Sequence, residues 1–116
     1  MNVYDCANQL KKSLTESREV KNYTNSLAKV KGDPGSKRML DDFRKKQIEL
    51  QAKQFSGIEP DKDELDQLQR LYSVVNMNPD INRFLQHEYE LSTLMNDIYK
   101  IISEAVDIDL GFEDEK

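Results

Sequence analysis

The stretch 78–106 is the longest uninterrupted helical signal in the chain, and it constrains the fold more than any other feature. Asn78 suits an N-cap and Pro79 suits the first helical position. The apolar residues then recur at steps of three and four, with one apolar turn missing at Glu88: Ile81, Phe84, Leu91, Met95, Ile98, Ile102 and Ala105. At about 1.5 Å per residue this helix is roughly 40 Å long. A small domain cannot cover such a helix alone, so we expect it to pack against other helices, inside the chain or from a partner.

The remaining helical signals predict an all-α fold, an elongated helical bundle of about five helices with antiparallel helical hairpins. Gly32 and Gly57 mark helix ends, and Asp61 to Glu64 has the pattern of a capping box. The expected helices cover residues 2–14, 18–31, 34–56, 61–77 and 79–106. We expect residues 1–106 to form a single helical domain and residues 107–116 to form an acidic, frayed C-terminal tail.

The composition favours amphipathic helices with solvated outer faces. Hydrophobic residues make up 37% of the chain and charged residues 34%, a balance that partial disorder would also give. Helices are preferred because the apolar residues are periodic. No stretch approaches the ~20 apolar residues of a membrane span, and the N-terminus lacks a signal-peptide core. We therefore expect a cytoplasmic protein without membrane insertion.

The net charge of -5 conceals an asymmetry between the two halves of the chain. Residues 1–58 carry 12 Lys and Arg against 7 Asp and Glu, whereas residues 59–116 carry 5 against 15. A basic half beside an acidic half favours complementary packing within the molecule or between two copies. A basic surface for RNA is the alternative, but the acidic half would repel phosphate. Nucleic-acid binding is therefore the less favoured interpretation.

The sequence predicts no catalytic residue, no cofactor and no metal site, and hence no enzyme. His87 is the only histidine and lacks the glutamate spacing of a zinc helix, while Cys6 is the only cysteine. The acidic run that starts at Asp61 lacks the glycine and glutamate of a calcium loop. The segment 32–35 has no preceding strand and no phosphate-binding lysine, so we interpret it as a helix junction.

The predicted helix 34–56 carries two apolar faces. One face holds Met39, Phe43 and Leu50, and the second holds Leu40, Ile48 and Phe55. A helix with two apolar faces is sandwiched between neighbours. We predict that Leu40, Ile48 and Phe55 contact a second copy in a homodimer; the alternative is a helix buried on two sides within its own monomer.

The same helix has a basic flank, which we define as Lys37, Arg38, Arg44, Lys45, Lys46 and Lys53. One interpretation is a solvated face paired with neighbouring acidic residues such as Asp41, Asp42 and Glu49. The other is a docking site for an acidic partner or RNA. The first interpretation is favoured.

Several of these motifs together resemble the YlbF/YmcA family of helical proteins, and within it the YheA-like branch. The resemblance runs almost from end to end of the chain. It rests on Tyr4-Asp5, on the run Ser36 to Met39, on Phe43-Arg44, and on Gln47, Gln51, Gln54 and Gly57. The closing pattern Leu91, Leu94, Ile98, Ile101 and Ile102 completes it.

The resemblance implies an all-α protein of helical hairpins that forms homo- or hetero-oligomers in the cytoplasm. It implies a non-catalytic regulatory role, with other YlbF/YmcA-type proteins or RNA-processing machinery as partners. Some relatives hold iron–sulfur clusters through cysteines. This chain has no cysteine beyond Cys6, so cluster binding does not carry over.

Overall fold

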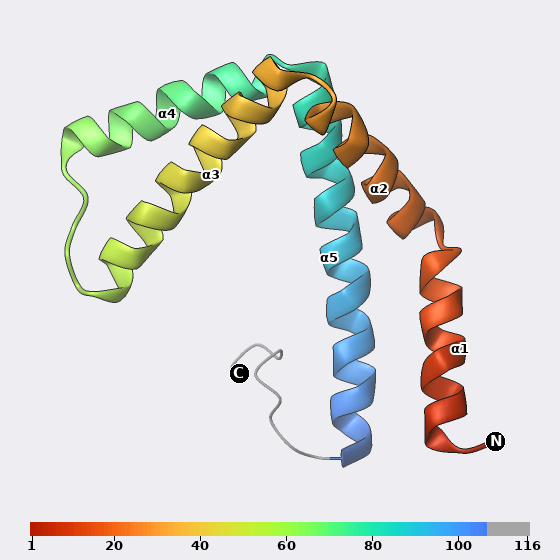
Figure 1. Cartoon of the computed structure of the whole chain (residues 1–116). Helices are drawn as coiled ribbons and strands as arrows, with labels where there is room; N and C mark the ends of the chain where they lie inside the picture. Colours follow the sequence, from red (N-terminus) through yellow and green to blue (C-terminus); the bar gives the residue numbers. More distant parts are fainter. Residues whose placement is uncertain (107–116) are drawn as a thin grey trace. The chain divides into compact units, whose positions relative to one another are not determined.

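The computed structural model of the chain describes residues 1–106, which form five α-helices and no strand (Figure 1). The helices are α1 (Val3–Thr15), α2 (Arg18–Lys31), α3 (Pro34–Phe55), α4 (Lys62–Asn76) and α5 (Pro79–Val106). The all-α prediction is confirmed, and each predicted boundary lies within one residue of the observed one. No described helix is long and apolar enough to cross a membrane.

The chain divides into two compact units, each of which combines segments of several helices. Within the described residues, unit 1 comprises residues 1–25 and 85–106, and unit 2 comprises Ser26–Phe84. The divisions fall inside α2 and α5. The single helical domain over 1–106 stays a prediction, and the predicted tail 107–116 lies outside the described residues.

Local signals fix the two ends of the α3–α4 connection. Gly57 has a φ of 78°, and its N–H donates to the carbonyl of Gln54 at 3.1 Å while the N–H of Ile58 donates to Lys53 at 2.8 Å. This pair of bonds is the Schellman motif, in which glycine takes the left-handed position without a Cβ clash. The predicted capping box is present: Asp61 accepts from the Glu64 N–H, and the Glu64 side chain accepts from the Asp61 N–H.

Unit 2 contains every buried apolar side chain among the described residues. They come from four helices: Val30, Leu40, Phe43, Leu50, Val75, Ile81 and Phe84. The rings of Phe43 and Tyr72 lie 6.0 Å apart in a tilted arrangement that joins α3 to α4. This contact adds to the packing between the two helices of the hairpin.

A chain of hydrogen bonds within unit 2 joins the start of α3 to the start of α5. The Ser36 hydroxyl donates to the Asp33 carboxylate at 2.7 Å, and Ser36 Oγ accepts from Asn78 Nδ2 at 2.9 Å. Asn78 Oδ1 in turn accepts from the N–H groups of Asp80 and Ile81 at 3.0 and 3.1 Å. Asn78 is therefore the N-cap of α5, as predicted. Asp33 lies at the N-cap position of α3 but accepts from a side chain instead of the backbone.

Unit 1 differs from unit 2 in its packing, because none of the described apolar side chains of unit 1 is buried. Its helices are well capped. Asn2 accepts from the Asp5 N–H at 2.8 Å, and Ser17 Oγ accepts from the Val20 N–H at 3.2 Å. The helical geometry is fixed locally, while its packing is incomplete.

We predict that Asn78→Ala lowers the free energy of unfolding by about 2 kcal/mol, because it removes an N-cap and leaves the buried Ser36 hydroxyl without a donor. Urea unfolding followed by circular dichroism measures this loss. Asn82→Ala is the matched control, since Asn82 lies exposed in the same helix. Equal stability of the two variants would contradict the proposed role of the hydrogen-bond chain.

Candidate protein-interaction surface

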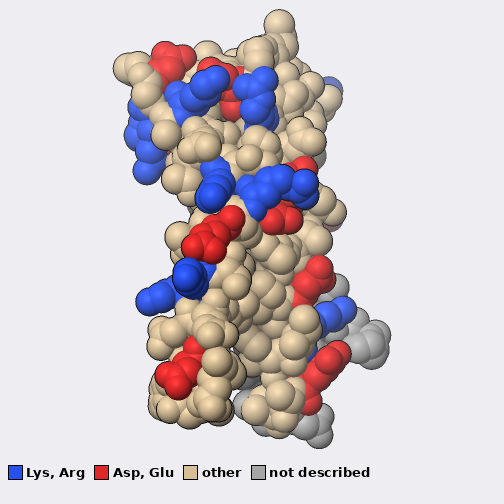
Figure 2. All heavy atoms as spheres, turned by 90° about the vertical axis from the view of Figure 1, so that its right-hand side faces the viewer, with Lys and Arg blue, Asp and Glu red and all other residues tan. Residues whose placement is uncertain are grey.

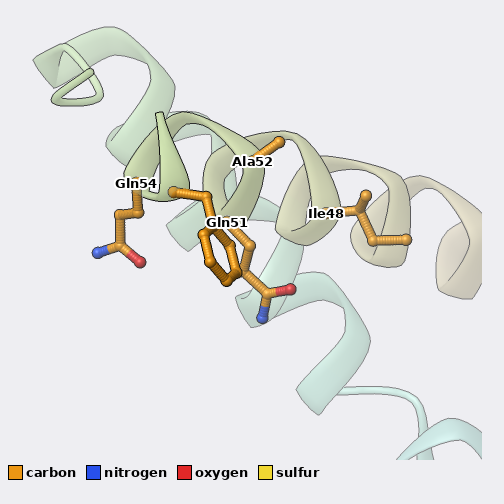
Figure 3. Close-up of a pocket in the computed structure, with 5 residues that line it drawn as sticks. Ile48, Gln51, Ala52 and Gln54 are labelled. Atoms are coloured by element: carbon orange, nitrogen blue, oxygen red, sulfur yellow. The ribbon is translucent and has the colours of Figure 1, made fainter. Parts of the chain in front are cut away.

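The most exposed apolar group of unit 2 lies at the C-terminal end of α3. Phe55, the last residue of α3, is 95% exposed, and Ile48, two turns earlier, is 64% exposed. A shallow hollow is lined by these two residues together with Gln51, Ala52 and Gln54, and we call these five residues the α3 surface. Figure 3 shows Ile48, Gln51, Ala52 and Gln54 along this part of the helix. The surface combines apolar contact area with amide groups that can donate and accept hydrogen bonds.

Leu40 does not belong to this surface. It is only 6% exposed and packs in the core of unit 2. At about 100° per residue, Leu40 lies roughly 60° from both Phe43 and Phe55 around the helix, at the border between the two apolar faces. Its burial places it on the covered side of that border. The predicted dimer contact reduces to Ile48 and Phe55, and their contact with a second copy stays a prediction.

An ion pair across the hairpin holds the end of α3 against the start of α4. Lys53 Nζ donates to the Glu64 carboxylate. This hydrogen bond holds the pKa of Glu64 below its ordinary value of 4.5 and raises the pKa of Lys53 above its ordinary value of 10.5. Because Glu64 also belongs to the capping box, one side chain fixes both the helix start and the hairpin.

The basic flank is largely engaged by the protein itself. Lys37 pairs with Asp41 at 2.9 Å and Lys46 with Glu49 at 3.1 Å, both along α3. The guanidinium of Arg44 lies 5.6 Å from the centre of the Phe84 ring, a cation–π contact. With Lys53 bound to Glu64, four of the six cations have partners in the protein.

The other two members of the basic flank, Arg38 and Lys45, are exposed and make no ion pair with another described residue. Two cations could contact far fewer phosphates than the roughly six to ten that a nucleic-acid-binding protein typically contacts. The arrangement favours the interpretation of a mainly solvated and paired face.

The described residues offer few groups for chemistry. No cluster of three or more His, Cys, Asp or Glu side chains in this part of the chain is placed to hold a metal ion. Cys6 is exposed, and His87 is half-buried. Asp61 caps α4, which confirms that the acidic run there serves a helix start.

Sequence reasoning missed two features of unit 2. Ser36 is 2% exposed and at the centre of the hydrogen-bond chain, although nothing in its local pattern marks it as buried. Ile58 is exposed beside the α3 surface. The glycine before it was a usable signal, because an apolar residue commonly follows the glycine of a Schellman motif.

Comparison with known proteins identifies the family. Residues 3–107 match the family described as control of competence regulator ComK, YlbF/YmcA. The chain belongs to the YlbF/YmcA family. Members of this family designated UPF0342 proteins include one from Symbiobacterium thermophilum, which is 44% identical over 110 residues, covering 95% of this chain and 98% of the relative. Another, from Caldicellulosiruptor saccharolyticus, is 42% identical over 107 residues, covering 92% and 89%.

Two solved structures have a similar fold. One is a protein of unknown function (DUF964) from Bacillus stearothermophilus, with a TM-score of 0.77 and 22% identity, covering 90% of this chain and 92% of that one. The other is yheA from Bacillus subtilis, with a TM-score of 0.64 and 25% identity, covering 92% and 97%. The likeness extends over nearly the whole helical region, and it agrees with the resemblance to the YheA-like branch.

The Lys53–Glu64 pair predicts a pH-dependent contribution to stability. The pKa of Glu64 is lowered in the folded state, so its contribution is present above the ordinary value of 4.5 and disappears as the pH falls through the folded pKa. The Lys53 contribution disappears only when the pH rises above 10.5. Wild type should therefore be more stable than Glu64→Gln near neutral pH, and the difference should vanish in acid.

Urea unfolding of both proteins across this pH range measures the difference. Gln at position 64 keeps the acceptor of the capping box, so the comparison isolates the charge. Glu59→Gln is the control, because Glu59 is exposed in the same connection. A constant difference from neutral to acidic pH would contradict the assignment.

Proposed function

We propose that this chain is a non-catalytic, cytoplasmic helical adaptor of the YlbF/YmcA type that acts through protein–protein interaction. Membership of a family described as controlling a competence regulator supports a regulatory role. The cytoplasmic location and the non-catalytic role are carried over from what the family resemblance implies.

The observation that carries the proposal is the exposure of Phe55 on a well-fixed hairpin. An apolar side chain of this size gains about 1.5–3 kcal/mol on full burial, and Phe55 has almost none of that gain in the monomer. Single exposed apolar residues are ordinary, but Phe55 lies with Ile48 on one hollowed stretch of helix. An aromatic anchor with an aliphatic neighbour and amides around it has the composition of a binding hot spot.

The proposed occupant of the α3 surface is another YlbF/YmcA-type protein. The resemblance implies hetero-oligomers within this family, and helical hairpins offer matching apolar rows to one another. RNA-processing machinery would then be reached through such a complex. Direct RNA binding by the basic flank receives less support, because four of its six cations already have partners.

Phe55→Glu should remove the partner while the fold is kept, since a 95% exposed side chain contributes little to the monomer core. Tagged wild type and variant are expressed in the native cytoplasm, and the captured proteins are quantified by mass spectrometry. We expect YlbF/YmcA-type proteins to be enriched at least tenfold with wild type and to be lost with Phe55→Glu.

Tyr89→Glu is the matched control, because Tyr89 is also an aromatic residue exposed on a helix (74%). It should capture the same proteins as wild type. Equal capture by Phe55→Glu would overturn the assignment to the α3 surface, and the absence of any YlbF/YmcA-type protein would overturn the proposed occupant.

A further inference from the structure

One arc of α3 is buried near the start of the helix and exposed near its end. Six residues at steps of four, three, four, four and three share this arc, and we call them the α3 row: Ser36, Leu40, Phe43, Gln47, Gln51 and Gln54. The first three are buried in unit 2, and the last three, all glutamines, are exposed. The α3 row therefore continues beyond the core that covers its first half.

A second hollow lies beside the open half of the α3 row, between α3 and α4. We call it the α4 groove, and it is lined by Phe43, Gln47, Leu65, Leu68, Gln69 and Tyr72. Gln47 belongs to this groove, whereas Gln51, one turn later on the same arc, belongs to the α3 surface. Leu65 and Tyr72 are both about half exposed, so the groove offers apolar area that the monomer leaves open. The two hollows adjoin along the α3 row.

This combined area carries no charge. None of the described residues that line the α3 surface or the α4 groove is charged, although charged residues make up 34% of the chain. Figure 2 shows, by comparison, side chains of both signs from the top of one face of the molecule to its bottom. Within residues 47–55, Glu49 pairs with Lys46 and Lys53 with Glu64, and these side chains line neither hollow. The area thus lacks the cations that bind phosphate groups, and it would leave an ionised group of a partner without a counter-ion.

The size of the α3 surface shows that it cannot be a complete binding site. A specific protein–protein interface buries about 800 Å² on each partner, from about 20–30 residues a side. The five residues of the α3 surface supply only part of such an area, so the contact must extend past them. The α4 groove adjoins the α3 surface and shares its uncharged character.

We propose that the open half of the α3 row binds one helix of the partner protein, which lies in the α4 groove and against Phe55 and presents an uncharged face of apolar and amide side chains. This deepens the proposed function, on which it rests, by naming the partner's element and the second part of its binding site. The core that covers the first half of the row is built from helices, and a partner helix continues the same packing. Glutamine side chains stay hydrated in the free protein and can bond across the contact, which suits a reversible partner.

Gln47→Glu and Gln69→Glu test the extension into the α4 groove, because each adds one charge and leaves the side-chain size unchanged. Tagged variants are expressed in the native cytoplasm, and the captured YlbF/YmcA-type proteins are quantified by mass spectrometry. We expect each variant to lower the capture at least tenfold, since an ionised carboxylate would face an uncharged helix. Both residues are exposed, so urea unfolding should show wild-type stability, and if one variant fails to fold, the other decides.

Gln67→Glu is the matched control, because it makes the same substitution on α4 but Gln67 lines a different hollow, together with Lys45 and Lys46. It should capture the same proteins as wild type. Wild-type capture by both Gln47→Glu and Gln69→Glu overturns the inference, and so does an equal loss with Gln67→Glu. If Phe55→Glu has lost its partner in the same experiment, the proposed function survives either result. A wild type that captures no protein of this family overturns both.

Salt dependence distinguishes an uncharged contact from docking through the basic flank. Between about 0.05 and about 0.5 M salt, which screens exposed charges, the capture by wild type should change less than twofold. A steep loss of capture as the salt concentration rises would overturn the inference.

A photo-crosslinking amino acid in place of Gln69 identifies the occupant. The crosslinked segment should come from a captured YlbF/YmcA-type protein and should carry apolar or amide residues at steps of three and four. A crosslink to RNA, to a second copy of this chain or to a charged segment would overturn the assignment, as would the absence of any crosslink to a captured protein.

Discussion

The hydrogen bond between Ser36 and Asn78 is the interaction on which the arrangement of unit 2 depends. It links two helix starts that are far apart in the sequence, and both ends of it are satisfied by further bonds to Asp33 and to the backbone of α5. Because Ser36 is buried, a register shift of either helix would leave a buried polar group without a partner. The link therefore selects one relative position of the starts of α3 and α5, around which the apolar core of unit 2 packs.

The two units differ in how many apolar side chains they bury. Unit 2 contains every buried apolar side chain among the described residues, whereas α1 and most of α5 keep apolar faces open. A protein of this size gains its stability from a small surplus of burial over conformational entropy. Capped helices with uncovered apolar rows are consistent with a chain whose remaining core forms on association.

The placement of charge explains why a helix rich in lysine and arginine need not be a nucleic-acid surface. Arg44 lies over an aromatic ring of the core and Lys53 fastens the hairpin, so these cations belong to the internal structure. The large apolar side chains that stay exposed on α3 are Ile48 and Phe55. The proposed contact with a protein partner rests on this apolar pair.

The sequence by itself determined the helices, because caps and glycines act locally: Asn78, Gly57 and the pair Asp61 and Glu64 each fix a helix end through bonds within a few residues. Family membership was also readable, since it rests on the order of such motifs. Only the tertiary structure decided that Leu40 is core while Phe55 is exposed, because periodicity shows which residues share a face and not which face is covered. It alone showed the bond between Ser36 and Asn78, since a contact across 42 positions leaves no local pattern.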